Sequence, residues 1–306
     1  MTLGRKFFHN TIVAPAGGGA DIQWLVQAGG GGGAASAGGG TSSGGGGAGG
    51  FRSSVTNSGV GTSAETAISG VSGDTLTIVV AGASAQEANG NTSSITSAGS
   101  HFTAITCTGG GKGDGRHSGA GNGGCGGGTY SSSTASAGTG ITGQGFGGGV
   151  SDGAGTYKGG GGGGTAATGT RTSPFGRGGI GTISTIIDTD DATSNSVGEV
   201  DSGNVYFGGG GGGYDQIDNS PNHPALGGGG NLHGSPSRAA LVNSGGGGAA
   251  GDGNARSQVP GASGVVILRM ATTTYSAGST SGSPTAVTDD SDTVLIFKSS
   301  GSFTLG

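Results

Sequence analysis

Two short stretches of the chain match patterns that nucleophilic and phosphate-binding sites use. Residues 40–44, Gly-Thr-Ser-Ser-Gly, fit the turn that exposes a serine nucleophile between a strand and a helix, but here they lie between glycine runs. Gly111-Lys112-Gly113 lacks the Ser or Thr with which a phosphate loop holds Mg²⁺. Because no pair of carboxylates can be placed for acid–base chemistry either, we predict that the protein is not an enzyme.

Residues that could bind a metal are sparse and poorly spaced. Residues 210–218 fit one turn of a calcium-binding β-roll, which needs stacked copies, and no second copy exists. The acidic stretches 188–191 and 289–292 are explained more simply as solvated turns than as sites for a cation that needs six or more oxygens. The five histidines show no close ligand spacing. We therefore expect no metal and no cofactor.

Cys107 and Cys125 are the two cysteines of the chain. A disulfide between them would close a loop of mostly glycine and serine and contribute about 3 kcal/mol. A protein assembled in the cytoplasm more often keeps buried thiols, so we expect free thiols and leave the disulfide as the alternative.

Glycine dominates the composition, with 82 of 306 residues, and it occurs in consecutive runs. Glycine at every third position and abundant proline, which collagen requires, are both missing, since the chain has only 7 Pro. A net charge of −5, with 9% charged residues, argues against disorder. The main runs are residues 29–33, 44–47, 159–164, 208–213, 227–230 and 245–248.

A glycine run can pack its backbone against other backbones at a distance that no side chain allows. We expect each run to form a polyglycine II helix, which has three residues per turn and makes no hydrogen bond within itself. Buried N–H and C=O groups must be paired, so the runs require one another as lateral partners. We predict a bundle of parallel and antiparallel polyglycine II helices.

The larger apolar residues gather in short segments that read as strands, and no segment has a helical period. The turn 299–302 predicts a hairpin between the last two segments. The expected fold class is mostly β and irregular, with a small antiparallel β-sheet from both chain ends, the polyglycine II bundle and almost no α-helix. The segments are residues 22–27, 76–80, 101–106, 183–187, 204–207, 265–270, 293–298 and 303–305.

Four motifs, in this order, resemble the glycine-rich domain of bacteriophage tail fibres and other virion proteins. The resemblance covers about residues 22–270, and it departs from the family in one respect. The strand pair 294–297 and 302–305 resembles the entry hairpin of the family but stands at the C-terminus. The motifs are residues 24–28 before the first glycine run, 44–52, 100–106 entering 109–111, and 261–269.

This resemblance implies a phage virion structural protein, a tail-fibre or fibre-tip adhesin whose loops contact a glycan or outer-membrane protein on the host. The other interpretation is a non-catalytic decoration protein of the capsid or tail. In either case the aromatic side chains could instead cap exposed helix ends. The receptor-contact candidates are Tyr130, Phe146, Tyr157, Phe175, Tyr214, His223, His233 and Arg238.

Three parts of the chain are expected: an N-terminal docking arm at 1–20, the glycine-rich domain at 21–270, and a linker with a β-hairpin at 271–306. The arm or the hairpin would bind other virion proteins, and a homo-oligomer stays open. We find no stretch long enough for a signal peptide or membrane span, so we expect assembly in the host cytoplasm and residence in the virion. Net acidity leaves no basic surface for nucleic acid.

Overall fold

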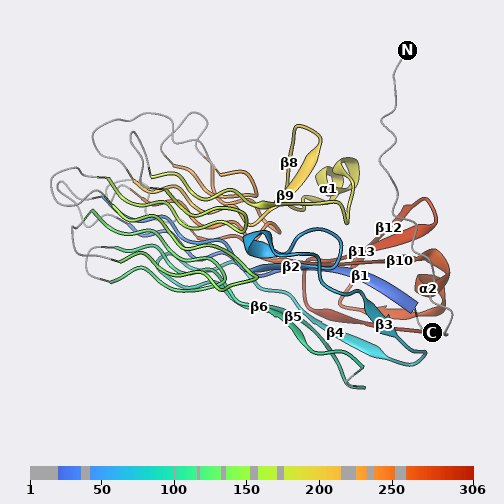
Figure 1. The fold of residues 1–306 in the computed structure, drawn as a ribbon. Coiled ribbons are helices and arrows are strands. Elements are labelled where there is room, and N and C mark those ends of the chain that lie inside the picture. Colours follow the sequence, from blue (N-terminus) through green and yellow to red (C-terminus); the bar gives the residue numbers. More distant parts are fainter. Residues whose placement is uncertain are drawn as a thin grey trace, which may run out of the picture.

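The computed structural model describes residues 20–35, 42–99, 101–115, 118–131, 136–151, 158–170, 176–214, 225–232, 238–251 and 260–306. Apart from Ala20, the expected docking arm at 1–20 therefore lies outside the described residues. The described chain forms two regions, one of antiparallel sheets and one of glycine-rich segments that run side by side (Figure 1).

Three antiparallel sheets make up the first region, with strand orders β12-β13-β10-β1-β2, β11-β14-β4-β5-β6 and β7-β9-β8. Strand β3 extends the first sheet by pairing with β1. The first sheet holds β1 (Ala20–Gln27), β2 (Phe51–Ser53), β3 (Ile68–Gly70), β10 (Val265–Ala271), β12 (Thr285–Asp289) and β13 (Asp292–Phe297). The second holds β4 (Thr75–Val79), β5 (Ser93–Ser97), β6 (Ile105–Cys107), β11 (Ser279–Ser281) and β14 (Gly301–Thr304), and the third β7 (Thr182–Ser184), β8 (Glu199–Asp201) and β9 (Asn204–Phe207).

Helices contribute little to the described chain. They are the 3-10 turn η1 (Gly59–Gly61) and the short helices α1 (Thr189–Asn195) and α2 (Thr272–Ala277). The expectation of a mostly β fold with few helices is confirmed.

The first sheet is buried on both faces, which explains why its central strands are continuously apolar. In β10, Val266, Leu268 and Met270 belong to one core cluster, while Val265 and Ile267 belong to the other. The first cluster also contains residues of the second sheet, such as Leu76 and Phe303, and the second contains Val205 and Phe207 of the third sheet. The three sheets thus stack as three layers, with the first sheet in the middle.

Both ends of the chain meet in the first sheet, as expected, because β1 pairs with β10 and β10 pairs with β13. The prediction of one small sheet was too simple, since three sheets form. The predicted hairpin between 294–297 and 302–305 is wrong: both edges of β13 are taken by β10 and β12, and β14 pairs with β4 and β11 in the second sheet. The intervening turn therefore carries the chain from one layer to another.

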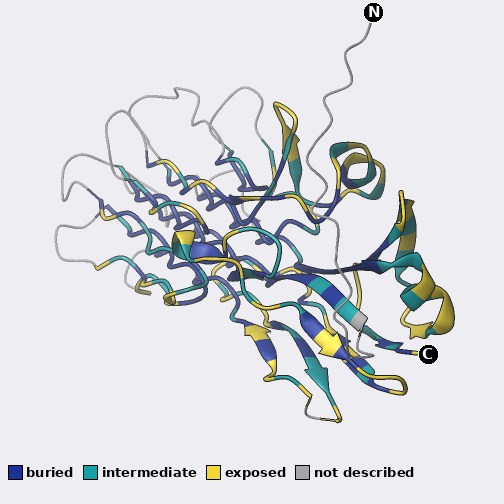
Figure 2. Cartoon of the chain, turned by 45° about the vertical axis from the view of Figure 1, so that its right-hand side comes forward, coloured by how far each residue is buried: buried dark blue, intermediate teal, exposed yellow. Residues whose placement is uncertain are grey.

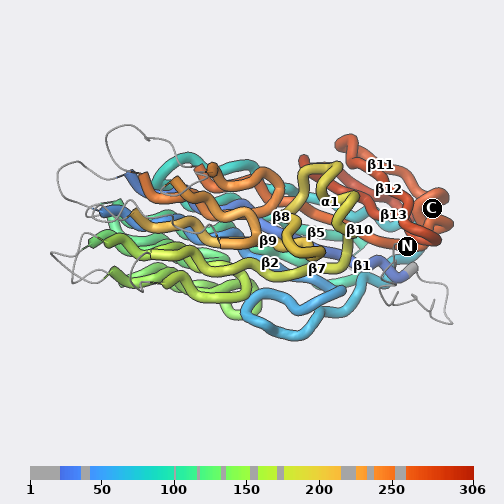
Figure 3. The backbone as a smooth tube through the Cα atoms, turned by 90° about the horizontal axis from the view of Figure 1, so that it is seen from above, coloured from blue at the N-terminus to red at the C-terminus, as the bar shows by residue number. Residues whose placement is uncertain are grey.

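Strands lead directly into the glycine segments, which are almost entirely buried (Figure 2). Segment 28–35 continues β1, segment 108–115 continues β6 and segment 208–214 continues β9. Seen from above, these segments extend away from the sheets as a set of neighbouring tubes (Figure 3). The sheets thus form the base from which the bundle extends.

Hydrogen bonds between the glycine segments repeat every three residues. In segment 42–50, every third N–H group donates to the same neighbouring segment. Three successive N–H groups therefore donate to three different neighbours. The donor and acceptor residues are 44 to 114, 47 to 111 and 50 to 108; 45 to 160 and 48 to 163; and 46 to 248 and 49 to 245. The second neighbour runs parallel to this segment and the other two run antiparallel, as the order of the acceptors shows. Segments 159–165 and 209–214 follow the same three-residue rule.

The close packing of backbones explains why these positions are glycine. A Cβ atom built on Gly161 would lie 2.1 Å from the carbonyl oxygen of Arg177, and one on Gly211 would lie 2.0 Å from that of Gly248. Real Cβ contacts are never that short, so a side chain would have to push the neighbouring backbone away. Gly212 differs, because its nearest neighbouring atom would be 3.8 Å away.

Candidate functional site

The end of the bundle that points away from the sheets, which we call the outer end, is where several glycine segments stop together. Ser43 accepts a hydrogen bond from the Tyr214 N–H at 3.0 Å, and its hydroxyl donates to the carbonyl of Gly251 at 3.0 Å. Ser42 accepts from the Ser131 N–H at 3.2 Å. These contacts hold four segments in register at the outer end. Ser42, the serine of the nucleophile pattern, is fully buried among them.

Among the predicted contact residues that the structure describes, Tyr130 and Tyr214 lie at this outer end. Tyr214 is half-buried and is the last described residue of its segment, and its carbonyl accepts from the Gly159 N–H at 2.8 Å. Tyr130, also half-buried, donates its N–H to the Asp114 carboxylate at 3.3 Å. The backbones of both tyrosines are thus fixed by the hydrogen-bond lattice, and Ala would leave these backbone bonds in place.

Asp114 is an unusual group to find at this place, because its side chain is only 3% exposed. One carboxylate oxygen, Oδ2, accepts from the Tyr130 N–H, while Oδ1 has no hydrogen-bond partner among the described residues. Nothing in the sequence singled out this residue.

Phe146 does not lie at the outer end with Tyr130 and Tyr214. Its N–H donates to Gly164 at 3.0 Å and its carbonyl accepts from Gly126 at 2.9 Å, so it lies inside the lattice. The adjacent Gln144 bonds Phe51 of β2 through its backbone carbonyl. Phe146 therefore lies toward the sheets rather than at the outer end.

Arg238 is committed to contacts within the molecule. Its guanidinium forms a two-pronged ion pair with Glu199 of β8, with Nη2 and Oε2 2.9 Å apart, and it also donates to the carbonyls of Gly229 and Ala225. The Glu199 carboxylate additionally accepts from the N–H groups of Gly227 and Gly228 at 2.8 Å. We assign Arg238 to the scaffold, where it joins the third sheet to the bundle.

The sequence interpretation missed Glu199 as the partner of Arg238. The available signal was the scarcity of charge: in a chain with 9% charged residues, a lone Arg among glycine runs indicates a structural ion pair. The remaining candidates, Tyr157, Phe175, His223 and His233, lie outside the described residues.

The two acidic stretches, which are remote in the sequence, meet in the fold. Asp188 caps α1 by accepting from the Asp191 N–H at 2.7 Å, and Arg269 of β10 donates to Asp289 at 2.7 Å and to Asp292 at 3.0 Å. The pKa of Asp191 is raised, mainly by burial and further by the negative charges of Asp188, Asp289 and Asp190. The Arg269 contacts join the β12–β13 hairpin to β10, and the Asp188 contact caps α1, so both acidic stretches have structural roles.

The two cysteines are free and fully buried, as expected. The Cys107 thiol donates to the Val26 carbonyl at 3.2 Å, and burial raises the pKa of both thiols far above the ordinary value. Thiolates are the reactive form of cysteine, so neither group is suited to nucleophilic or redox chemistry in the folded protein.

Comparison with known families identifies the chain. Residues 8–271 match the family described as a glycine-rich domain, and the protein belongs to that family. Searches of curated proteins and of solved structures found no match. None of the helices in the described part of the chain is long and apolar enough to cross a membrane.

Proposed function

We propose that the glycine segments are polyglycine II helices and that they form the scaffold of a bacteriophage virion protein, a tail-fibre or fibre-tip adhesin. The three-residue repeat of the hydrogen bonds supports the first part, because polyglycine II has three residues per turn. Each N–H group that donates to a different segment ties the bundle together, so the scaffold resists deformation as a unit.

One observation carries the adhesin proposal: the glycine segments end together at the outer end, opposite the sheets. Ser43 is hydrogen-bonded to Tyr214 and Gly251 there, and the adjacent Ser42 is hydrogen-bonded to Ser131. The stretches of sequence that connect the segments beyond these residues carry Tyr157, His223 and other polar residues. Recognition residues are commonly placed on loops that a fixed scaffold positions. The partner would be a host-surface glycan or outer-membrane protein.

The second candidate is a non-catalytic decoration protein of the capsid or tail. The C-terminal part of the chain favours it, because β11 is exposed along its whole length and both β11 and β12 are edge strands. Edge strands present unpaired backbone groups that another virion protein can bind. In this role the outer end of the bundle would bind no host receptor.

The test uses phage particles that carry the protein, after mass spectrometry has found it in purified virions. A variant with Tyr214→Ala, His223→Ala and His233→Ala removes side chains but no backbone hydrogen bond. Particles with normal amounts of this variant should adsorb to host cells at least about tenfold less well, as expected when contact residues are truncated. Val242→Ala, which truncates a side chain 59% exposed, is the control.

Unchanged adsorption by particles with normal amounts of the triple variant contradicts the adhesin role and favours decoration. Absence of the protein from purified virions contradicts both candidates.

A further inference from the structure

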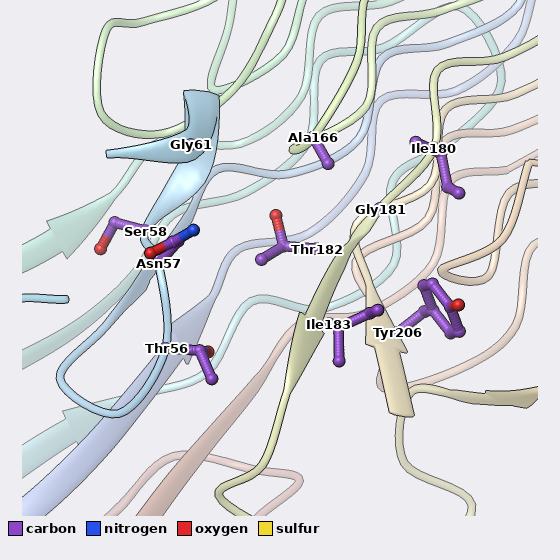
Figure 4. A pocket seen from close by; sticks show the side chains of 10 residues that line it. All are labelled: Thr56, Asn57, Ser58, Gly61, Ala166, Ile180, Gly181, Thr182, Ile183 and Tyr206. Carbon is purple, nitrogen blue, oxygen red and sulfur yellow. The ribbon is translucent and has the colours of Figure 1, made fainter. Parts of the chain in front are cut away.

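An open groove of about 550 Å³ lies where the bundle meets the third sheet. One side is formed by the loop after β2 and the end of η1, and the other by the chain that enters β7, together with Tyr206 of β9 (Figure 4). The lining residues are Thr56, Asn57, Ser58, Gly61, Ala166, Ile180, Gly181, Thr182, Ile183 and Tyr206.

The chemistry of this lining is neutral, since none of the ten residues carries a charge. Ile180 and Ile183 are 39% and 40% exposed, an unusual amount for large apolar side chains. Ile183 and Tyr206 are cross-strand partners, so their side chains share one face of the third sheet. The groove thus has an apolar wall with an aromatic ring.

Three polar side chains of the groove have no hydrogen-bond partner among the described residues. The amide of Asn57, an exposed residue, and the hydroxyl of Tyr206 form no hydrogen bond with any described residue. The third is the hydroxyl of Thr56, which is buried. The hydroxyls of Thr182 and Ser58 are already used: Thr182 donates to the Thr165 hydroxyl at 3.0 Å, and Ser58 donates to the Glu65 carboxylate at 3.1 Å. An amide and a phenol can both donate and accept.

The free edge of β7 borders the groove, but it is poorly suited to adding a peptide strand. The Thr182 N–H donates to the hydroxyl of Thr165 at 2.9 Å, and the Ile180 carbonyl accepts from Ala166 at 3.0 Å. A peptide that adds to a sheet edge needs such backbone groups unpaired. The groove therefore favours a ligand bound through side chains.

We propose that this groove binds a neutral sugar unit of a glycan. A pyranose has an apolar C–H face, which fits the Tyr206 ring and the two isoleucines, and a rim of hydroxyls, which fits the amide of Asn57. Apolar walls with a few placed polar groups are the usual design of small-ligand sites. The inference does not rest on the adhesin role, because the groove lies at the base of the bundle and not at its outer end.

Ligand-observed saturation-transfer NMR on the isolated protein tests this inference. The probes are methyl glucoside, methyl galactoside, methyl mannoside and N-acetylglucosamine at millimolar concentration, with glucuronate as a charged comparison. At least one neutral sugar should receive saturation. Tyr206→Ala should weaken its binding about tenfold or more, which is the loss of a single good contact. Asn57→Ala should weaken it severalfold.

Two variants serve as matched controls. Val200→Ala truncates an exposed apolar residue of the same sheet outside the groove and should leave binding unchanged. Tyr206→Phe keeps the ring, so it separates the contribution of stacking from that of the hydroxyl.

Three results would overturn the proposal: no saturation of any neutral sugar by the wild type, stronger saturation of glucuronate than of every neutral sugar, or unchanged binding in Asn57→Ala. The last is decisive even if Tyr206→Ala does not fold, because Asn57 is an exposed loop residue whose replacement leaves the sheet intact.

Discussion

The two regions of the molecule bury their backbones in different ways. In the sheets, hydrogen bonds lie in one plane, so each strand has two faces on which side chains such as Trp24 and Phe297 pack. In the bundle, successive N–H groups of one segment point to three different neighbours, so most positions leave no room for a side chain. The sheets can therefore vary their sequence as long as the pattern of apolar residues is kept, whereas the bundle requires glycine at most of its positions.

Gln27 shows how the two regions are joined. It is the last residue of β1 and is fully buried, although its side chain is polar. Its amide donates to the carbonyls of Ala28 at 3.1 Å and Gly49 at 2.9 Å. In segment 42–50, to which Gly49 belongs, the carbonyls of Ser43 and Gly46 accept from the N–H groups of Tyr214 and Gly211. At Gly49 the side chain of Gln27 takes the place of the next peptide donor.

The largest expected effect is that of a bulky side chain in the bundle. Gly161→Val would place Cβ 2.1 Å from the Arg177 carbonyl oxygen and force neighbouring segments apart. We expect a loss greater than the roughly 4–5 kcal/mol that marks exceptional single substitutions, seen as failure to give soluble folded protein. The control is Gly82→Val, at an exposed position where a Cβ has no neighbour within 4 Å. Equal melting temperatures for both variants would mean that the runs are not packed as described.

In the sheets, the corresponding test is a substitution that leaves a cavity in the core. Phe297→Ala removes a fully buried ring between the first and second sheets and should cost about 3–5 kcal/mol, measured by chemical denaturation. Phe297→Leu keeps most of the volume and should cost much less. If the leucine variant were as damaging as the alanine variant, the sheets would share the intolerance of the bundle, and the comparison between the two regions would fail.

The cysteines should report on the integrity of the whole molecule. Cys107 and Cys125 are both fully buried, and their raised pKa values keep them as thiols at neutral pH. A thiol reagent should modify neither residue in the native protein and both after denaturation. Rapid modification of the native protein would show that the junction between bundle and sheets opens readily.

The smallest effect concerns the acidic stretches. Because the pKa of Asp191 is raised in the folded state, its charged form is disfavoured there, and the protein gains stability as the pH falls through that raised pKa. Asp191→Asn should stabilise the protein slightly at pH 7, within the roughly 0–1 kcal/mol of exposed charges. The gain should vanish near pH 3, where Asp191 is protonated in both states. A gain that is unchanged at pH 3 would contradict this cause.

Much of the β region could be predicted from the sequence. The segments 22–27, 204–207 and 265–270 became strands because their apolar residues fit sheet faces. The pairing of the C-terminal strands could not be predicted, since it depends on β10 and β12 occupying both edges of β13. The segment 183–187 was predicted as one strand, but β7 ends at Ser184, and Ile186 and Ile187 fill the core without pairing.

The candidate site was less predictable. The sequence indicated that aromatic and basic residues between glycine runs could bind a partner, but not which of them the scaffold uses itself. Arg238 pairs with Glu199, which is 39 residues away, and no local sequence pattern predicts such a contact. The groove at Tyr206 was likewise hidden, because its walls come from the loop after β2, the entry to β7, and β9.

The most direct test of the central claim, that glycine is required in the bundle because backbones pack against backbones, compares two neighbouring residues of one run. Gly211→Ala would place Cβ 2.0 Å from the Gly248 carbonyl oxygen, whereas Gly212→Ala would meet nothing closer than 3.8 Å. The account predicts that Gly211→Ala lowers the free energy of unfolding by about 2 kcal/mol or more. Gly212→Ala should leave it unchanged or raise it by about 0.4–1 kcal/mol, since alanine restricts the unfolded chain. Equal losses at both positions, or a loss confined to Gly212→Ala, would contradict it.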